Sequence, residues 1–558
     1  MSPATGSGNA TPYNRPRPTH CPAGDRQTPM TTHTLNLIPP PDETEIPLDR
    51  AAIRLHPEDD VAIARTNLAP GQTLRLSDAQ VITITQTIPC GHKFALRAIP
   101  AGQAIHRYGQ IIGLASADIA PGEHVHTHNV AVHVFERPDD WGADARPLAP
   151  IPAGEQRTFM GYRRPQGRAG TRNVIAVIST VNCSAHTVRE IAHHFTRERL
   201  ASFPNVDGVI ALTHHAGCAT RVGGADYVLL QRVLAGMARH PNVGACVLVG
   251  LGCEANQIAD LARNYALDAG GAGSPPVMLT IQDEGGIRKT VQAGIAAVEA
   301  LLPVVNATSR SPQPISELMI ALQCGGSDSW SGVTANPALG LAADRLVQHG
   351  GSVVLAETPE IYGAEHLLAR RAISAEVADK LMQKVRWWEA HAARLNLEID
   401  NNPSPGNKAG GLTTIYEKSL GAIAKAGSAP LMDVFDYAAP VTARGFSFMD
   451  SPGYDPVSVT GQVAGGCTLV AFTTGRGSVF GFKPAPSIKI ASNSDLYRRM
   501  EDDMDVNAGR ILDGEPMQRI ADELFELMIA VASGRRTKSE AQDVGEAEFN
   551  PWMTGGVL

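Results

Sequence analysis

The sequence predicts a multi-domain α/β protein in which a small N-terminal all-β module precedes two α/β domains with mainly parallel sheets. The 558 residues are enough for roughly two to four domains, each with its own core. A glycine-turn motif recurs within residues 51–137, where little helix is indicated. From residue 174 onward, short apolar runs rich in β-branched residues alternate with helical stretches, which is typical of buried parallel strands in βαβ units.

The composition is that of an ordinary globular protein. Apolar residues make up 43% and charged residues 19% of the sequence, and the net charge is −8, so neither a nucleic acid nor an anionic membrane is expected as a partner. No apolar run approaches the roughly 18–20 residues of a membrane span, and no secretory signal is recognised. Eight cysteines in so long a chain do not make a disulfide framework, so we expect a cytoplasmic protein with reduced thiols.

Residues 1–50 are predicted to be a disordered extension, because they are rich in Pro, Thr, Ser and Asn and lack apolar periodicity. Residues 51–137 are predicted to form the β module. There the pattern apolar-x-x-Gly-x-x-apolar occurs four times, at residues 68–74, 88–94, 99–105 and 119–125. Pro and Gly at fixed offsets supply turns between short strands, so the module should be compact.

Two histidine motifs stand out in the β module. His92 and Lys93 lie at one of the glycine turns, where an imidazole and an ammonium group would be exposed and rigidly held. His124, His126 and His128 are expected on one face of a strand, since side chains alternate with period two. Three imidazoles on one face suit a divalent metal, although a solvent-facing polar strand edge would explain them as well.

Residues 138–158 carry four prolines among polar residues and are predicted to be a linker. The first α/β domain is predicted over residues 159–305. Just before its first strand, residues 161–173 hold four arginines among glycines, and guanidinium forks are suited to carboxylate. We expect an anion site that includes Arg172, with a solvated loop as the alternative.

Four apolar runs each lead into a cysteine, at Cys183, Cys218, Cys253 and Cys324. The loops after the carboxyl ends of parallel strands form the ligand crevice, so the four thiols are expected to share the functional edge of one sheet. A metal or redox role is one interpretation of this placement. The alternative is packing, because free cysteine often behaves as a small buried hydrophobe.

The second α/β domain is predicted over residues 315–558, ending in a structural helix near residues 516–533. After the strand that ends at Cys324, a Gly-Gly turn and a helix start would aim backbone N–H groups at a ligand, beside Ser327, Asp328 and Asn336. The spacing is neither a P-loop nor a GxGxxG turn, so no nucleotide is predicted.

Later loops of this domain add charged candidates. Glu357 and Glu360 follow a strand and are candidates for acid/base or metal roles, with helix capping as the alternative. Residues 402–411, which include Lys408, are too rich in Gly and Pro for regular structure and long enough to be a functional loop. Arg476 lies between two glycines after the last strong strand, where it can approach a ligand carboxylate closely.

Five sets of motifs resemble those of the altronate/galactarate dehydratase family, the UxaA-type hydro-lyases of sugar acids. They are GHKFAL at residues 91–96, GLGCE at 250–254, CGGSD with SGVTANP at 324–328 and 331–337, NPSPGNKAGG at 402–411, and TTGRG at 473–477. The resemblance runs from about residue 55 to the C-terminus. EHVHTHN at 123–129 and ETPEIYGAEHLL at 357–368 are closer to the altronate branch, whereas TTGRGSVFG at 473–481 departs from the family's TTGRGTPYG and leaves the preferred sugar acid open.

The resemblance implies an SAF-type β module fused to a dehydratase body. It implies loss of water from a 2,3-dihydroxy sugar acid, D-altronate above all, to give a 2-keto-3-deoxy acid. It also implies Fe(II), with another divalent metal such as Mn as the alternative, an iron–sulfur cluster left open, and no nucleotide. Galactarate dehydration, a sulfolactate-type elimination and a non-catalytic sugar-acid sensor are the alternative functions. A small-molecule substrate is the expected partner, and a homo-oligomer is left open.

The chemistry distributes roles among the candidates, because the enzyme must neutralise the carboxylate, remove the C2 proton and help hydroxide leave C3. The candidates for proton transfer are His92, Lys93 and Glu357. The candidates for substrate binding are Arg172, Ser327, Asp328, Asn336, Lys408 and Arg476. The preferred metal ligands are Cys183, Cys218, Cys253 and Cys324, which lie beside the anion-binding loops, with His124, His126 and His128 as the alternative.

Overall fold

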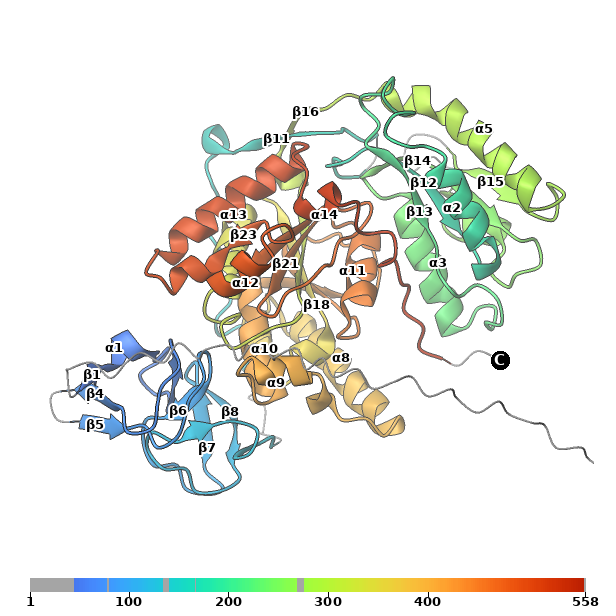
Figure 1. Cartoon of the computed structure of the whole chain (residues 1–558). Helices are drawn as coiled ribbons and strands as arrows, with labels where there is room; N and C mark the ends of the chain where they lie inside the picture. Colours follow the sequence, from blue (N-terminus) through green and yellow to red (C-terminus); the bar gives the residue numbers. More distant parts are fainter. Residues whose placement is uncertain (1–44, 78–79, 134–139, 166, 268–274, 556–558) are drawn as a thin grey trace, which may run out of the picture.

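The computed structural model describes residues 45–77, 80–133, 140–165, 167–267 and 275–555. Three domains follow one another along the chain: a small β module, an α/β domain, and a larger α/β domain (Figure 1). The predicted fold class is confirmed, with small sheets first and all-parallel sheets in both α/β domains. The predicted extension lies outside the described residues as far as residue 44. Its last residues form β1 (Ile46–Pro47) and the start of α1 (Leu48–Ala51).

The β module is built from three small sheets, with strand orders β1-β4-β5, β2-β3-β6-β9 and β10-β8-β7. The other strands are β2 (Ala52–Ile53), β3 (Val61–Ala64), β4 (Thr73–Ser77), β5 (Gln80–Thr83), β6 (Lys93–Ala95), β7 (Ala104–Arg107), β8 (Gln110–Ala115), β9 (His124–Val125) and β10 (Val130–Ala131). The glycine of each predicted repeat has a positive φ between 78° and 85°, a conformation that glycine adopts without steric cost. The repeated turn is therefore confirmed.

The segment predicted as a linker packs against the largest domain where it is described. Arg370 forms ion pairs with Asp140 and Asp144, and η1 (Ala153–Glu155) leads into β11 (Thr158–Gly161). β11 pairs antiparallel with β16 (Ser311–Pro314), so the chain enters and leaves the second domain through one two-stranded ribbon.

The second domain has a four-stranded parallel sheet in the order β13-β12-β14-β15. Its strands are β12 (Val174–Ser179), β13 (Gly208–Leu212), β14 (Val243–Gly250) and β15 (Val277–Thr280). Its helices are η2 (Asn182–Ser184), α2 (Ala185–His193), α3 (Ala225–Ala238), α4 (Ile258–Asn264) and α5 (Ile287–Asn306). Helices cover the sheet (Figure 1), and the central strands β12 and β14 are almost fully buried, as their continuous apolar sequences predict.

The C-terminal domain has a seven-stranded parallel sheet in the order β19-β20-β18-β17-β21-β22-β23. Its strands are β17 (Met319–Cys324), β18 (Ser352–Ala356), β19 (Leu431–Phe435), β20 (Gly445–Met449), β21 (Leu469–Thr474), β22 (Ser487–Ala491) and β23 (Val506–Asn507). Its α-helices are α6 (Ala335–Gln348), α7 (Glu365–Ala369), α8 (Ala375–Arg394), α9 (Pro405–Ala409), α10 (Ile415–Ile423), α11 (Asp455–Ala464), α12 (Ser494–Arg499), α13 (Met517–Ala532) and α14 (Lys538–Ala541). Short 3-10 turns are η4 (Ile315–Glu317), η5 (Thr358–Glu360), η6 (Ile399–Asn401), η7 (Ala424–Ala426) and η8 (Ala508–Ile511).

Two expectations are corrected by this topology. The four strands that lead into cysteines do not share one sheet, because β12, β13 and β14 belong to the second domain and β17 to the C-terminal domain. The loop at residues 402–411 is not wholly irregular. It contains the short helix α9, since Ser404 and Asn407 form a capping box around Pro405 at the first helical position.

The β module is not a loosely attached unit. The largest core cluster joins its side chains, such as Ile105 and Val125, to those of the C-terminal domain, such as Leu339 and Phe446. α10 lies beside β8 at this junction (Figure 1). Because buried apolar area is the main favourable term in folding, the two domains should hold a fixed relative position. Within the described part of the chain, no helix combines the length and the apolar character needed to cross a bilayer.

Candidate active site between the β module and the C-terminal domain

A cleft of about 670 Å³ opens between the β module and the C-terminal domain. The β module contributes Arg50, Arg65, Thr66, Cys90 and Gly91, and the C-terminal domain contributes Asp328, Trp330, Ala409, Gly410, Gly475, Arg476, Asn493, Ser494, Asp495, Arg498, Arg499, Gly509, Leu512 and Asp513. A volume of this size suits a small molecule. Five arginines against three aspartates give the lining a positive balance, so the cleft favours an anionic ligand.

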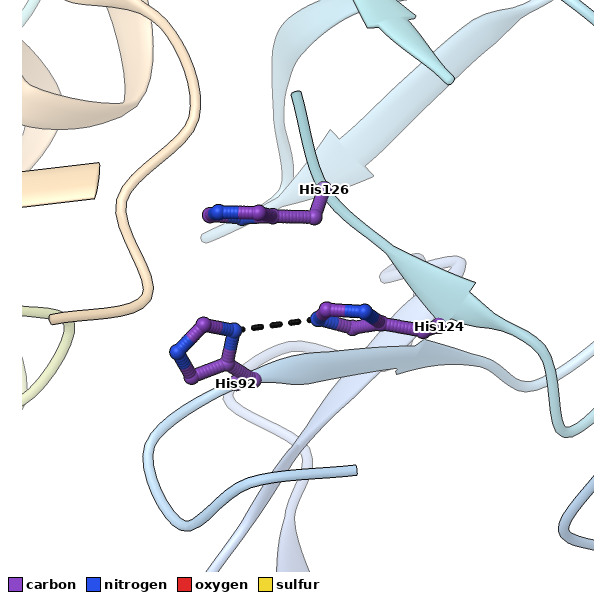
Figure 2. Close-up of side chains that lie close together, drawn as sticks. All are labelled: His92, His124 and His126. Carbon is purple, nitrogen blue, oxygen red and sulfur yellow. Dashed lines mark hydrogen bonds between the residues drawn. The ribbon is translucent and has the colours of Figure 1, made fainter. Parts of the chain in front are cut away.

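Three histidines of the β module gather beside this cleft. His92 precedes β6, His124 begins β9 and His126 follows it, and the antiparallel pairing of β6 with β9 brings the three rings together (Figure 2). One nitrogen from each ring lies within 4.8 Å of the others, and His92 Nδ1 is 3.0 Å from His124 Nε2. His92 Nε2 lies 3.3 Å from the carbonyl oxygen of Ala409, a residue of the cleft lining.

The three imidazoles have the charge state that a metal requires. Burial, together with the neighbouring imidazoles, lowers the pKa of His124 to about 3. Burial and the Lys93 ammonium lower the pKa of His126 to about 4, and the same two causes lower the pKa of His92. Neutral imidazole has a lone pair to donate, and His126 Nδ1 is buried without a hydrogen-bond partner. These residues therefore fit a divalent metal ion.

The predicted histidine triplet is corrected in one member. His128 is exposed and its ring centroid lies 5.5 Å from that of His124, outside the group. The strand ends at Val125, and a turn follows in which the Asn129 backbone N–H donates to the His126 carbonyl. Alternation with period two stops there, so His128 leaves the shared face and His92 from the neighbouring strand completes the set.

Lys93 has a structural position rather than an exposed one. Its ammonium group is fully buried, 2.9 Å from Glu417 Oε1 and 2.6 Å from the carbonyl oxygen of Gly411. Arg107 of the same module also pairs with Glu417 and donates to Ser329. Burial alone would raise the pKa of Glu417, but Lys93 and Arg107 outweigh it and hold that pKa at about 2. One carboxylate of the C-terminal domain thus binds two cations of the β module.

Sequence reasoning did not identify Glu417. The residue stands three positions after Thr414, which caps α10, and such spacing indicates only a helix start. Its partner cations come from residues more than 300 positions away along the chain. No local signal could have paired them.

Arg476 lies where the sequence predicted an anion-binding group. It lines the cleft, its side chain is exposed, and its charge contributes to lowering the pKa of His92. Among the described residues, its guanidinium has no ion-pair partner. A side chain at Gly475 would place its Cβ 2.1 Å from Asp328 Cγ, so only glycine lets the two loops meet beside the arginine.

Hydrogen bonds of the turn after β17 hold together the loops that line the cleft. Asp328 is buried and accepts hydrogen bonds from the Ser331 backbone and hydroxyl, from the Ser492 hydroxyl and from the Asn493 amide. Burial raises its pKa, and these donors act against that rise. The carbonyl of Ser327 accepts from Asn407, which ties the turn to α9. Asp328 is therefore engaged in holding the loops, although it lines the cleft.

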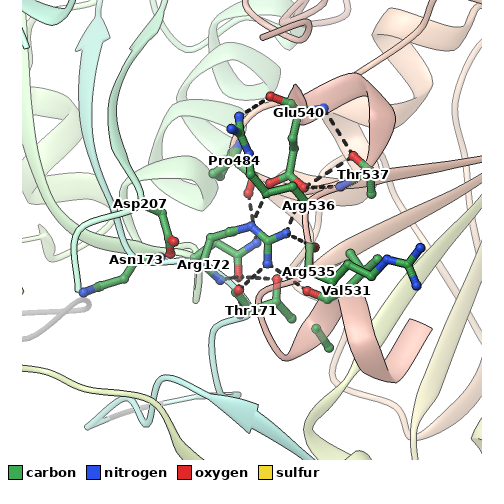
Figure 3. A network of polar contacts seen from close by, with 12 residues as sticks. Thr171, Arg172, Asn173, Asp207, Pro484, Val531, Arg535, Arg536, Thr537 and Glu540 are labelled. Carbon is green, nitrogen blue, oxygen red and sulfur yellow. Dashed lines mark hydrogen bonds and ion pairs between the residues drawn. The ribbon is translucent and has the colours of Figure 1, made fainter. Parts of the chain in front are cut away.

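Arg172 is not in the cleft. Its guanidinium forms a bidentate pair with Glu540, at 2.7 and 2.8 Å, and donates to backbone carbonyls of Thr171, Val531 and Arg535 (Figure 3). Every donor direction of this buried side chain points to protein. Arg172 therefore joins the second domain to the C-terminal helices, and the loop before β12 is a structural junction.

Other predicted residues also lie outside the cleft lining, namely Ser327 of the turn after β17, Asn336, Lys408 and Glu357. Asn336 is buried, donates to the Gly421 carbonyl and accepts from Thr473. Lys408 lies on α9 near Asp400. Burial raises the pKa of Asp400, and the Lys408 charge opposes that rise. Glu357 is buried at the end of β18 and has a left-handed backbone with φ 72°. Burial raises its pKa, and the charge of Glu360 raises it further.

The preference for cysteine metal ligands is not supported. Cys183, Cys218 and Cys253 are exposed at the sheet edge of the second domain, whereas Cys324 is buried in the C-terminal domain. Among the described residues, the one group of three or more potential ligands within 4.8 Å is the histidine set. Cys324 is separated from the other three because β17 belongs to the sheet of the C-terminal domain, whereas β12, β13 and β14 share the sheet of the second domain.

Comparison with known families defines the class of protein. Three family models match the chain: the altronate/galactarate dehydratase SAF domain over residues 50–133, the second domain of D-galactarate dehydratase/altronate hydrolase over 161–306, and the D-galactarate/altronate dehydratase C-terminal domain over 315–557. The matches follow the three domains of the fold, and they define an enzyme of the hydro-lyase class.

The chain belongs to the altronate/galactarate dehydratase family. It is 36% identical to the altronate dehydratase of Escherichia coli, over 88% of this chain and 97% of that protein. It is 34% identical to the altronate dehydratase of Bacillus subtilis, over 89% and 98%. It is also 36% identical to the galactarate dehydratase (L-threo-forming) of E. coli, over 87% and 93%. The resemblance stated from the motifs is confirmed.

Proposed function

We propose that this protein dehydrates D-altronate to a 2-keto-3-deoxy sugar acid. One observation carries the proposal: the histidine set lies beside the arginine-lined cleft to which Arg476 belongs, and His92 Nε2 is 3.3 Å from the carbonyl oxygen of Ala409 in the cleft lining. The relatives named altronate dehydratase support this substrate, as does their coverage of nearly the whole chain. Galactarate is the second candidate, favoured by the equal identity to a galactarate dehydratase.

The carboxylate of the sugar acid binds Arg476 in this proposal. Loss of the C2 proton builds negative charge beside a carboxylate that is already anionic, so a nearby cation must stabilise the transition state more than the ground state. Arg476 can do so because its guanidinium is exposed to the cleft and is not neutralised by a described carboxylate. Glycines on both sides leave room for the substrate carboxylate to approach.

His92, His124 and His126 hold the metal in this proposal, and Fe(II) is the ion. Such an ion supplies Lewis acidity for the C3 hydroxyl that leaves. His92 then acts as a ligand rather than as a base, because Nδ1 faces His124 Nε2 and Nε2 donates to the Ala409 carbonyl. Lys93 cannot transfer a proton to substrate from its buried ion pair, and its role is to hold the module in place.

The test is an assay for keto-acid formation by protein loaded anaerobically with Fe(II) and offered D-altronate and galactarate separately. We expect product from D-altronate, and we expect Arg476→Ala and His124→Ala to abolish it while His128→Ala retains it. Product from galactarate alone would transfer the proposal to the second candidate. Sulfite release from sulfolactate without keto acid from either sugar acid would replace it with the sulfo-lyase reaction. Binding of sugar acids without any product would indicate a sensor.

A further inference from the structure

Cys324 and Lys425 form an unusual pair outside the cleft. Cys324 is the last residue of β17 and Lys425 lies in η7, and the Lys425 Nζ atom is 2.7 Å from Cys324 Sγ. Both side chains are buried, at 2% and 1% exposure. The separation falls within the roughly 2.7–3.2 Å of an N–H···O hydrogen bond, although sulfur is a larger atom than oxygen. The nitrogen–sulfur distance is therefore short for a hydrogen bond to sulfur.

The Lys425 amine donates to sulfur, while the neighbouring Glu360 carboxylate is engaged elsewhere. Glu360 Oε1 is 2.5 Å from the Lys418 ammonium, and Glu360 Oε2 is 3.4 Å from Cys324 Sγ. Glu360 is thus paired with Lys418, and its second carboxylate oxygen accepts from the Cys324 thiol. A buried lysine normally pairs with a carboxylate, because burying a charge is costly unless it is paired. At Lys425 the sulfur takes the position where an acceptor oxygen is expected.

We propose that Cys324 and Lys425 are a modification site, at which dioxygen joins them through a covalent nitrogen–oxygen–sulfur bridge. Sulfur and nitrogen together carry three hydrogens, whether as thiol and amine or as thiolate and ammonium. N–O and O–S bonds form, and two of those hydrogens leave with the second oxygen atom as water. Cysteine and lysine supply four electrons, and both oxygen atoms of dioxygen are reduced.

The burial of the pair decides which oxidation product forms. A thiolate in solvent is oxidised stepwise to sulfenic, sulfinic and sulfonic acids, or is capped by another thiol. Cys324 is 2% exposed and its sulfur contacts Lys425 and Glu360, so glutathione and other bulky thiols cannot reach it, whereas dioxygen is small and uncharged. Among the lysines that the structure describes, Lys425 is the one whose amine contacts Cys324 and could attack its oxidised sulfur.

The chain contains internal controls for this chemistry. Cys246 and Cys467 are also buried, at 5% and 0% exposure. In the described part of the protein, neither thiol has a lysine as a hydrogen-bond partner; the Cys246 thiol faces the Ala238 carbonyl at 4.0 Å. Burial alone is common to all three thiols, and only Cys324 has an amine within bonding reach of one inserted oxygen atom.

The bridge would connect two elements that support the cleft. Residues 325–328 run from Cys324 into the cleft lining, and η7 follows α10, which carries Glu417. The two bridged residues are 101 positions apart along the chain. The proposal does not depend on the dehydratase reaction, because Cys324 and Lys425 lie outside the cleft lining.

The test is peptide mapping by mass spectrometry of the full-length protein, purified without oxygen and then exposed to air-saturated buffer in the folded state. We expect a new species in which the Cys324 and Lys425 peptides are linked, with one oxygen atom gained and two hydrogens lost. Dithiothreitol should return the two separate peptides. Lys425→Arg and Cys324→Ser should not form the species, and their circular dichroism spectra will show whether they fold.

The wild-type result is decisive even if both variants fail to fold. Linked peptides without the added oxygen would indicate a direct sulfur–nitrogen bond and would overturn the proposal. Sulfenic or sulfinic acid at Cys324 with unmodified Lys425 would also overturn it, as would a free Cys324 thiol after prolonged exposure. Cross-linked Cys246 or Cys467 would show that the chemistry is not specific to this pair, contrary to the proposal.

Discussion

Replacing Glu417 by Gln should loosen the β module from the C-terminal domain by about 3–5 kcal/mol. The change leaves two buried cations, Lys93 and Arg107, facing a neutral amide, and breaking a buried ion pair costs about this much. The lowered pKa of Glu417 leads to a similar figure. Holding the pKa of Glu417 at about 2 instead of 4.5 corresponds to about 3 kcal/mol of stabilisation of the ionised form.

Hydrogen exchange followed by mass spectrometry measures this loss where it occurs. Amides of β6 and β7, which carry Lys93 and Arg107, should exchange at least about 100-fold faster in Glu417→Gln than in the wild type, since 1.4 kcal/mol corresponds to about tenfold. Glu526→Gln is the matched control. Glu526 pairs with Arg157 at 2.7 Å, but its side chain is 51% exposed, and such surface pairs contribute about 0–1 kcal/mol.

The same carboxylate sets a pH dependence. A pKa that is lower in the folded state contributes stability that is full above the ordinary value of 4.5 and fades as the pH falls toward 2. The difference between wild type and Glu417→Gln should therefore be constant near neutral pH and should shrink below about pH 4.5. Equal exchange in the two proteins at neutral pH would show that the buried cluster does not hold the module, and the argument from burial would fail.

Three further outcomes follow from the site. Loss of a residue that only hydrogen-bonds a metal ligand weakens metal binding by roughly 10–100-fold, so His124→Ala, which removes a ligand, should weaken it by more. His128→Ala should leave metal affinity near the wild-type value. Isothermal titration with Fe(II) or Mn(II) under argon measures both affinities. Arg476→Lys should lower kcat/KM about 10–100-fold, because a charged hydrogen bond contributes about 1.5–3 kcal/mol, and unchanged kinetics would remove Arg476 from the substrate site. Gly411→Ala should destabilise by at least about 1–2 kcal/mol, since φ is 94° and the added Cβ would lie 2.4 Å from a carbonyl of the β module; Gly406→Ala, whose nearest neighbour is 3.7 Å away, should keep the wild-type melting temperature.

Much of the fold could be predicted because its signals are local. The strands β12, β14, β17 and β21 are continuous apolar runs, and a buried parallel strand needs nothing more than such a run with helices on either side. Prediction weakened where a short-range signal was misjudged. Residues 404–407 contain their own cap, which turns a Gly/Pro-rich loop into α9.

The candidate site was predicted in part. Arg476 could be identified because flanking glycines expose a cation after a strand, and that property is local. Arg172 also lies in a loop rich in Gly and Arg, here before a strand, yet its guanidinium is bound by Glu540 and the Val531 carbonyl, which are more than 350 residues later in the chain. The sequence cannot distinguish an arginine that is available to bind a ligand from one that is already paired within the protein.

The order of the amino acids by itself determined the family, the three domains and the presence of imidazole, guanidinium and thiol groups near strand ends. The tertiary structure alone decided which of these groups meet. Pairing of β6 with β9 placed His92 beside His124 and His126, and division of the strands between two sheets separated Cys324 from the cysteines of the second domain. The physical reason is that local sequence sets backbone conformation, whereas a binding site depends on distances between segments that only packing of the whole chain brings together.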